Sequence, residues 1–255
     1  MQLKSQASSD FTREKLQILS HMNIVFLDDG QGRRVKTIRF TGVNVQIVNG
    51  LGATNGFPAN PESTFAPDTR TNGLGNLIVG YNEMGNPNGD DRTGSHYLVA
   101  GHGNSYSSFG GLVVAQDNTA SSVYATVSGG WSNVASGPRS TVGGGLSNHS
   151  AGNTSAVSGG RSNTASGDDS AVSGGASNVA SGLSSWSGGG NLNEAQGDRA
   201  TVVGGIFNLS SGTQSAVTGG ETNTASGFRA VVSGGRNRSA LGPNDWVAGS
   251  LQEDQ

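Results

Sequence analysis

Four carboxylates in the first half of the chain are the residues best suited to acid–base chemistry. Asp68 lies in one segment rich in Gly, Asn and Pro, and Glu83, Asp90 and Asp91 lie in or beside a second. Two carboxylates held about 5–10 Å apart can cleave a glycosidic bond, because one protonates the leaving group while the other attacks the sugar or activates water. A polysaccharide-cleaving enzyme is therefore one hypothesis, and it requires acidic side chains from neighbouring elements to converge in a cleft.

The histidines and the remaining acidic residues give little support for metal binding. His96, His102 and His149 have a spacing that matches no metal signature, and the chain has no Cys to supply thiolate ligands. Calcium-binding β-rolls need an Asp in every repeat unit, whereas the pair Asp168-Asp169 occurs once. We therefore predict no metal, no cofactor and no catalytic residue, with the glycan-cleaving enzyme kept as the alternative.

Three tryptophans are candidates for contacts with a partner or a glycan: Trp131, Trp186 and Trp246. Exposed aromatic rings stack on sugars or anchor a protein partner. The other interpretation is structural, because the same rings could face the axis of an oligomer and fill it.

Composition excludes several classes of protein. Gly makes up 43 of the 255 residues, charged residues are 13%, hydrophobic residues are 33%, and the net charge is -3. Disorder usually combines low hydrophobicity with high net charge, so near-neutrality argues against it. Without a basic excess we expect no binding to nucleic acid. No run of about 18 apolar residues predicts a transmembrane segment, and the N-terminus lacks the apolar stretch of a secretory leader.

From about residue 122 the sequence repeats itself every 15 residues, with the consensus S-A-V-S-G-G-x-x-N-x-A-S-G-x-x. One asparagine column accompanies the repeat: Asn118, Asn133, Asn148, Asn163, Asn178, Asn193, Asn208 and Asn223. Each unit also holds a Gly pair, a single Gly and an apolar residue, as in Gly159-Gly160, Gly167 and Val157. The register continues through eight units without an insertion or deletion, which indicates one repeated structural unit.

A unit of this length, with three Gly, is too short and too flexible for a helical repeat. It predicts two short strands and two tight turns, which form one coil of an all-β parallel β-solenoid, or β-roll, with coils paired at about 4.8 Å. Val157 and Ala165 should point inward, and glycines should serve corners that need positive φ or close approach. We predict that the asparagines form an internal ladder between coils; the alternative is that Asn is only a turn former.

The rest of the chain divides by pattern into four regions. We predict an N-terminal helix and first strand in residues 1–36, degenerate coils with inserted loops in 37–121, the regular β-roll in 122–250 and an acidic tail in 251–255. The predicted helix covers residues 11–22 with Asp10 as its cap. Predicted strands cover 24–27, 37–40, 43–48, 76–80 and 97–101.

Outward-facing columns and the thin core bear on function. The column from Arg139 to Arg229 mixes both charges with hydroxyls, which is typical of a solvated surface. The column from Thr126 contains Trp186 and Trp246, which disrupt the flat Thr array that ice binding requires.

Each coil buries roughly one Val and one Ala, worth about 3 kcal/mol, far less than the entropy of ordering a coil. Backbone hydrogen-bond ladders or contacts with partner chains must supply the missing stabilisation, and this requirement favours an oligomer.

The unit S-A-V-S-G-G-x-x-N-x-A-S-G, over about residues 97–250, resembles the short head repeats of trimeric autotransporter adhesins. In that family each repeat forms one coil of a left-handed parallel β-roll and three chains wrap together, although the period of the family is one residue shorter than the period here. The family's C-terminal membrane-anchor barrel and its leader have no counterpart in this sequence. Segments 40–50 and 75–83 look like a module that accompanies such repeats in large bacterial surface or fibre-like proteins, often after a coiled coil.

The resemblance implies a bacterial, extracellular homotrimer whose N-terminal helix ends a stalk. We therefore expect a non-enzymatic structural or adhesive fibre head that presents a rigid trimeric surface to a surface glycan or a host protein. Two alternatives stay open. One is a carbohydrate-binding or polysaccharide-cleaving β-helix protein, and the other is a tail-fibre fragment of a phage or injection machine.

Overall fold

The computed structural model describes residues 13–249. The chain separates into two compact units, Met1–Gln46 and Ile47–Gln255, and each is described by itself. The predicted helix cap Asp10 and the predicted acidic tail 251–255 lie outside the described residues.

The first unit is a short helix followed by an antiparallel hairpin. Helix α1 spans Arg13–Ser20, and strands β1 (Met22–Asp28) and β2 (Arg34–Phe40) pair across a tight turn. The turn forms because the Asp29 carboxylate accepts the backbone N–H groups of Gln31 and Arg33 at 2.9 and 3.0 Å. The strand predicted at 24–27 is confirmed within β1.

The sequence placed the start of the coils too early. Residues 37–40 are a strand, but they pair with β1 in the hairpin instead of forming a coil, and 43–48 are not a strand. Residues 47–76 form loops with one 3₁₀ turn, Ala66–Asp68, and the first strand of the solenoid is β3, Leu77–Val79. The alternating pattern at 37–40 fits either kind of pairing, and the Asp29-Gly30 turn decides between them.

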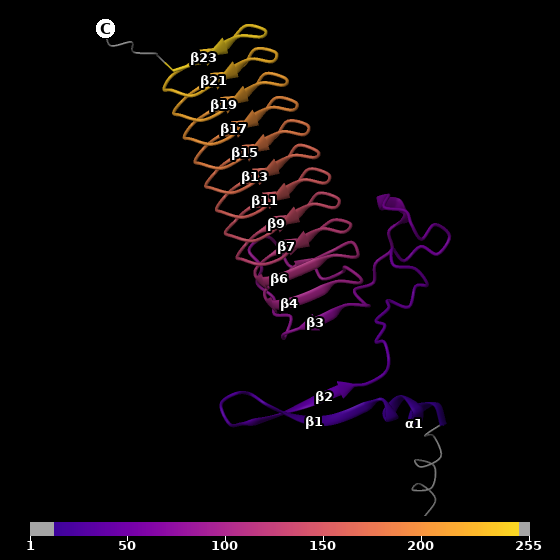
Figure 1. Ribbon diagram of the computed structural model, residues 1–255. Helices are drawn as coiled ribbons and strands as arrows, with labels where there is room; N and C mark the ends of the chain where they lie inside the picture. Colours follow the sequence, from indigo (N-terminus) through magenta and orange to yellow (C-terminus); the bar gives the residue numbers. More distant parts are fainter. Residues whose placement is uncertain (1–12, 250–255) are drawn as a thin grey trace, which may run out of the picture. The chain divides into compact units, whose positions relative to one another are not determined.

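The second unit is the predicted all-β parallel solenoid (Figure 1). Within the described residues, one sheet has 12 strands: β3 Leu77–Val79, β4 Leu98–His102, β6 Leu112–Gln116, β8 Thr126–Val127, β10 Thr141–Val142, β12 Ala156–Val157, β14 Ala171–Val172, β16 Trp186–Ser187, β18 Thr201–Val202, β20 Ala216–Val217, β22 Val231–Val232 and β24 Trp246–Val247. The other sheet has 10 strands over the same part of the chain: β5 Ser105–Tyr106, β7 Thr119–Ala120, β9 Val134–Ala135, β11 His149–Ser150, β13 Thr164–Ala165, β15 Val179–Ala180, β17 Glu194–Ala195, β19 Leu209–Ser210, β21 Thr224–Ala225 and β23 Ser239–Ala240.

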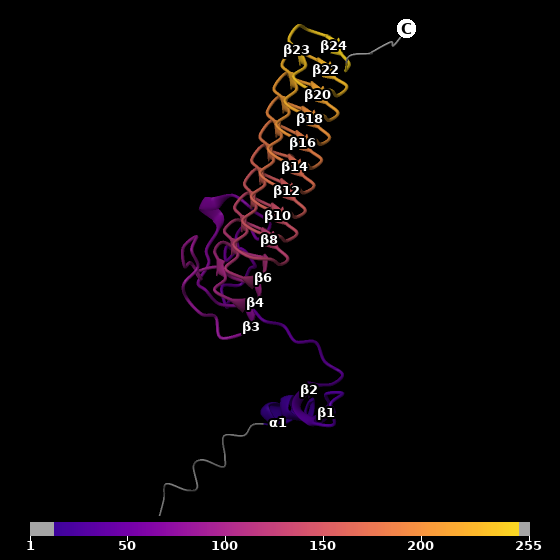
Figure 2. The ribbon, with the colours of Figure 1, turned by 90° about the vertical axis from the view of Figure 1, so that its left-hand side faces the viewer.

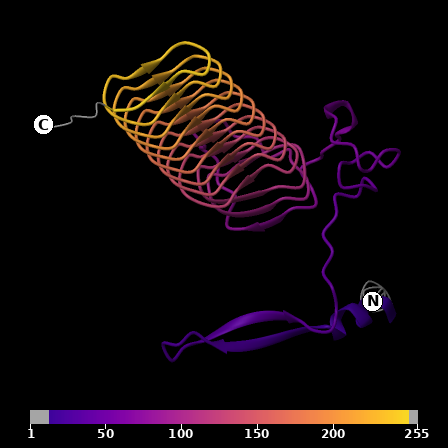
Figure 3. The same cartoon turned by 45° about the horizontal axis from the view of Figure 1, so that its top comes forward.

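Each coil therefore adds one short strand to each sheet (Figure 2), and successive coils follow nearly the same outline (Figure 3). The pairing is in register with the sequence repeat, so Val142 lies beside Val157 and Ser150 beside Ala165. The first coils are one residue shorter than the regular ones, since Leu98 pairs with Leu112, and they carry a larger aromatic core of Tyr97, Tyr106 and Phe109. These aromatic residues close the N-terminal end of an otherwise thin core.

The asparagine column forms a continuous ladder inside the solenoid. From Asn133 to Asn223 every side chain is buried, and each Oδ1 accepts the backbone N–H of the ladder position in the next coil. Asn163 shows the full pattern. Its Nδ2 donates to the Gly159 carbonyl of its own coil at 2.9 Å and to the Gly175 carbonyl of the next coil at 3.0 Å. Its Oδ1 accepts the Asn178 N–H at 2.9 Å, so every polar atom of the buried amide is satisfied.

Glycine is required where coils approach most closely. A Cβ on Gly167 would collide with the carbonyl oxygen of Gly182 in the next coil, and one on Gly160 would lie 2.6 Å from the ladder nitrogen of Asn163. Two columns of residues at the corners also have left-handed backbone although they are not glycine, and this conformation was not predicted from the sequence. They are Ser132, Ser147, Ser162, Ser177, Leu192, Phe207, Thr222 and Asn237, and Arg139, Thr154, Asp169, Ser184, Arg199, Gln214, Arg229 and Asn244.

We predict that Asn163→Ala will lower the stability of the solenoid strongly. The substitution leaves the Asn178 N–H and the Gly159 carbonyl without their side-chain partner in a buried site, at a cost of about 1–3 kcal/mol for each unsatisfied group. The Gly175 carbonyl loses the same partner but keeps the Arg161 N–H. The measurement is the urea midpoint followed by circular dichroism. Ser166→Ala, on an exposed position of the same coil, is the control and should change the midpoint little. Equal urea midpoints for the two variants would indicate that the asparagines stabilise the solenoid only through their preference for turns.

A second prediction tests whether Gly167 is required because neighbouring coils approach closely there or only because it is a glycine. Gly167→Ala should destabilise by at least about 1–3 kcal/mol, because the new methyl group meets the Gly182 carbonyl. Gly159→Ala is the matched control, since a Cβ there meets nothing within 4 Å. Its thermal midpoint should stay the same or rise slightly, as reduced freedom of the unfolded chain favours folding. Equal losses in the two variants would contradict the steric explanation.

Candidate functional site

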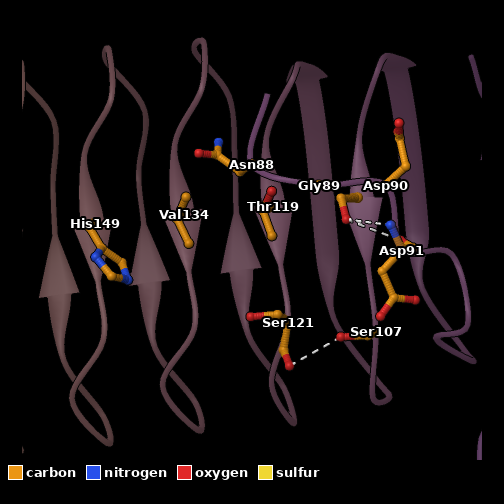
Figure 4. Close-up of a pocket in the computed structure, with 10 residues that line it drawn as sticks. Asn88, Gly89, Asp90, Asp91, Ser107, Thr119, Ser121, Val134 and His149 are labelled. Carbon is orange, nitrogen blue, oxygen red and sulfur yellow. Dashed lines mark hydrogen bonds between the residues drawn. The ribbon is translucent and has the colours of Figure 1, made fainter. Parts of the chain in front are cut away.

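An open groove of about 580 Å³ crosses the outer face of the sheet that begins with β5 (Figure 4). Its floor takes one residue from each of four successive strands: Ser105, Thr119, Val134 and His149. These residues occupy the same outward column of the repeat, so their side chains stand in a row across the coils. Ser107 and Ser121 form a parallel row beside them, and the segment Asn88–Asp91 lines the edge of the groove.

The segment at the edge is held to the solenoid by its own backbone and side chains. Asn86 donates from Nδ2 to the carbonyls of Gly103 and Asn118 at 2.8 and 3.1 Å. The Ser105 hydroxyl accepts the Asp91 N–H at 3.0 Å and donates to the Asp91 carbonyl at 3.1 Å. This loop is therefore a fixed wall of the groove.

Two of the four carboxylates proposed for glycoside cleavage reach the groove, and they lie next to each other in the chain. Asp90 accepts the backbone N–H groups of Gly85 and Asn86 and pairs with Arg92 at 3.3 Å. The hydrogen bond from the Gly85 backbone, helped by Arg92, lowers the pKa of Asp90 below its ordinary value. A general acid needs a raised pKa, so this environment is unsuited to proton donation. Asp91 is exposed, and one of its oxygens accepts the N–H and hydroxyl of Thr93 at 2.9 and 2.7 Å.

The other two carboxylates lie elsewhere. Asp68 accepts a hydrogen bond from the Asn60 amide at 3.3 Å and does not line the groove. Glu83 is half-buried, and its Oε2 has no hydrogen-bond partner among residues 13–249. The structure therefore places Asp90 and Asp91 at the groove, whereas Asp68 and Glu83 do not line it.

A second open groove, of about 530 Å³, adjoins the first. It is lined by Thr64, Phe65, Ala66, Thr69 and Thr71 on one side and by Ser107, Ser108, Ser121, Ser122, Val123 and Pro138 on the other. The two grooves share Ser107 and Ser121, so they meet at this pair of serines. Sequence reasoning placed both inserted loops but gave no signal that they flank the same strip of sheet.

The three histidines considered for metal binding make different contacts in the structure. His96 holds the 49–54 segment, through the Thr54 carbonyl at 3.0 Å and the Asn49 N–H at 3.3 Å. His102 lies 3.7 Å from the Asp117 carboxylate. His149 ends the floor of the groove, with Nε2 at 2.8 Å from the Ser136 hydroxyl. Within residues 13–249, no three His, Asp or Glu side chains are grouped so that they could hold a metal ion.

The tryptophans lie on outward positions of the solenoid. Trp186 and Trp246 are 37% and 69% exposed and lie across their sheet, donating to the hydroxyls of Ser173 and Ser233 in the preceding coil. Trp131 is 52% exposed and donates to Asp117 at 3.0 Å. Their contact with a partner or glycan remains a prediction, as does their placement on an oligomer axis.

No protein-family model matches the chain, and neither does any curated protein. In the described part of the chain, no helix has the length and apolarity needed to span a bilayer.

The half-buried imidazole of His149 allows a prediction of pH dependence. Burial lowers the pKa of His149 below its ordinary value of about 6.5. The unfolded chain then binds this proton more tightly, so the contribution of the neutral imidazole to stability is complete above about pH 6.5 and is lost as the pH falls through the lower folded-state pKa. NMR titration should show the His149 ring protonating below about pH 6.5. His149→Gln, which cannot titrate, should lose less stability than the wild type between about pH 7.5 and 5. An identical loss in the two proteins would contradict this assignment.

Proposed function

We propose that the protein is a non-enzymatic fibre head, assembled as a homotrimer, that presents its solenoid as a rigid surface for binding. The solenoid supports the proposal that the protein presents a rigid surface for binding. Its ladder fixes the coils in register, so outward columns can vary without disturbing the interior. The resemblance of the repeat to adhesin heads supports a place outside the cell.

The observation that carries the trimer is the bare hairpin of the first unit. Among residues 15–46 no side chain is buried. Ile24 and Ile38 pair directly across the hairpin and are 60% and 59% exposed. Phe26 and Phe40, on the same face by strand alternation, are about half exposed. A soluble protein rarely leaves an apolar face of this kind uncovered, and an isolated two-stranded hairpin is marginal in water. Packing of the same face from three chains would bury it.

The grooves on the solenoid give the carbohydrate-binding alternative a specific location. Their hydroxyl-rich lining is suited to binding, while the lowered pKa of Asp90 disfavours cleavage. Binding without hydrolysis is therefore compatible with the role of a head and does not require a separate function.

The trimer is tested by light scattering after size exclusion. The full chain should give about three times the 25.7 kDa of one chain. The double variant Ile24→Thr/Ile38→Thr should give the mass of a single chain, because Thr keeps the strand propensity and removes apolar area. Leu241→Thr is the control: this leucine is 66% exposed on the solenoid, and its replacement should leave the trimer intact. A wild-type monomer would contradict the trimer, and a monomeric Leu241→Thr variant would move the interface to the solenoid.

A further inference from the structure

The two grooves of the solenoid are continuous with each other. Residues 88–91 line the first groove, Thr64, Phe65, Ala66, Thr69 and Thr71 line the second, and the two meet at Ser107 and Ser121. We name this combined surface, lined by the residues of the two grooves, the loop trough. Regular coils with no inserted loops follow it along the chain, so the trough is the place where the repeat is modified on one face.

The floor of the trough is suited to a ligand rich in hydroxyl groups. The Ser107, Thr119 and Ser121 hydroxyls can each donate and accept hydrogen bonds, and Asp91 adds a carboxylate acceptor at the edge. Strands repeat across the floor at about 4.8 Å, which is close to the length of one sugar unit in an extended chain. Phe65, which is 68% exposed, lines the second groove and offers a ring on which the apolar face of a sugar can stack.

An unpartnered buried hydroxyl provides independent evidence for a ligand. Thr119 is only 7% exposed, yet its Oγ1 hydrogen-bonds to none of residues 13–249. Buried hydroxyl groups normally have a partner, because leaving one unsatisfied costs about 1–3 kcal/mol. Among the described residues with an unpartnered buried hydroxyl, Thr119 is the one that lines the trough, in its floor row on the outward side of β7 (Figure 4).

The charges around the trough select the class of ligand. The residues that line it include Asp90 and Asp91 but no Lys or Arg. His149, at the end of the floor, is neutral near pH 7 because burial lowers its pKa. Asp90 is already paired with Arg92, but Asp91 forms no ion pair with any of residues 13–249. An anionic ligand would therefore face the unpaired Asp91 carboxylate, whereas an uncharged one would meet no repulsion.

We propose that the loop trough binds an uncharged oligosaccharide, held by the hydroxyls of Ser107, Thr119 and Ser121, the carboxylate of Asp91 and the ring of Phe65. The proposal rests on the role of the protein as a ligand-presenting head and names the class of ligand.

The test is binding of the full-length trimer to a panel of uncharged hexasaccharides, namely cello-, malto-, manno-, xylo- and chitohexaose. Sialylated and sulfated oligosaccharides serve as the anionic set, and saturation-transfer NMR and calorimetry are the readouts. At least one uncharged hexasaccharide should bind, and the anionic set should bind at least tenfold more weakly. Failure of the whole uncharged set to bind a folded trimer would overturn the trough proposal and leave the proposed head standing.

Variants then locate the site. Asp91→Ala and Phe65→Ala should each weaken binding by about tenfold or more, the scale of one lost charged hydrogen bond or stacking contact. Thr119→Val should weaken binding while the thermal midpoint stays the same or rises, because it removes an unsatisfied hydroxyl. Thr224→Val, in the same outward column far from the trough, is the matched control and should bind as the wild type does. Binding that survives all three trough variants but is lost in Trp131→Ser, Trp186→Ser or Trp246→Ser would place the glycan site on the tryptophans and overturn the proposal.

Discussion

The asparagine ladder is the interaction on which the rest of the solenoid depends. Each buried amide joins a carbonyl of its own coil to a carbonyl and an N–H of the next coil, so Asn163 binds Gly159, Gly175 and Asn178 at once. The glycines are fixed by the same contact, since a Cβ on Gly160 would collide with the amide. Hydrogen bonds that repeat in every coil replace the large apolar core that so short a coil cannot supply. The amide makes the same three contacts in every regular coil, so the ladder repeats with the period of the sequence.

Freedom at the outward columns follows from this fixed interior. The ladder extends back to Asn104, whose Oδ1 accepts the Asn118 N–H at 3.1 Å, even though that coil is one residue shorter than the regular ones. Insertions are therefore found before the regular repeat, where the aromatic core of Tyr97, Tyr106 and Phe109 supports the first coils. Tyr97 also donates to the Ser107 carbonyl at 2.7 Å, directly under the trough, and burial raises the pKa of its phenol. The part of the solenoid that carries the loops is thus also the part with the largest core.

The periodic features could be predicted from the sequence, and the non-periodic ones could not. The ladder and the register follow from columns that recur once in every repeat unit. The left-handed corners were missed because they hold residues such as Phe207 and Arg229, whose intrinsic preferences oppose positive φ; cross-coil bonds, such as that from the Phe207 N–H to Asn191, override those preferences. The trough was missed because Ser107 and Ser121 look like any other serine in a serine-rich repeat. Their position is distinctive only because two inserted loops, each lining one groove, bring both grooves to this pair of serines.

In the structure, the first unit and not the interior of the coils leaves apolar residues uncovered. The sequence argument assigned the deficit in burial to the coils, yet in the solenoid Val157, Ala165 and Asn163 are fully enclosed by the chain itself. In the first unit the apolar residues remain on the surface, including both members of the pair Ile24 and Ile38. Association through that unit would satisfy the apolar hairpin and would not require the outward columns of the coils. If the protein assembles as proposed, the surface that forms the trimer is distinct from the surface proposed to bind a ligand, and a substitution in one would leave the other intact.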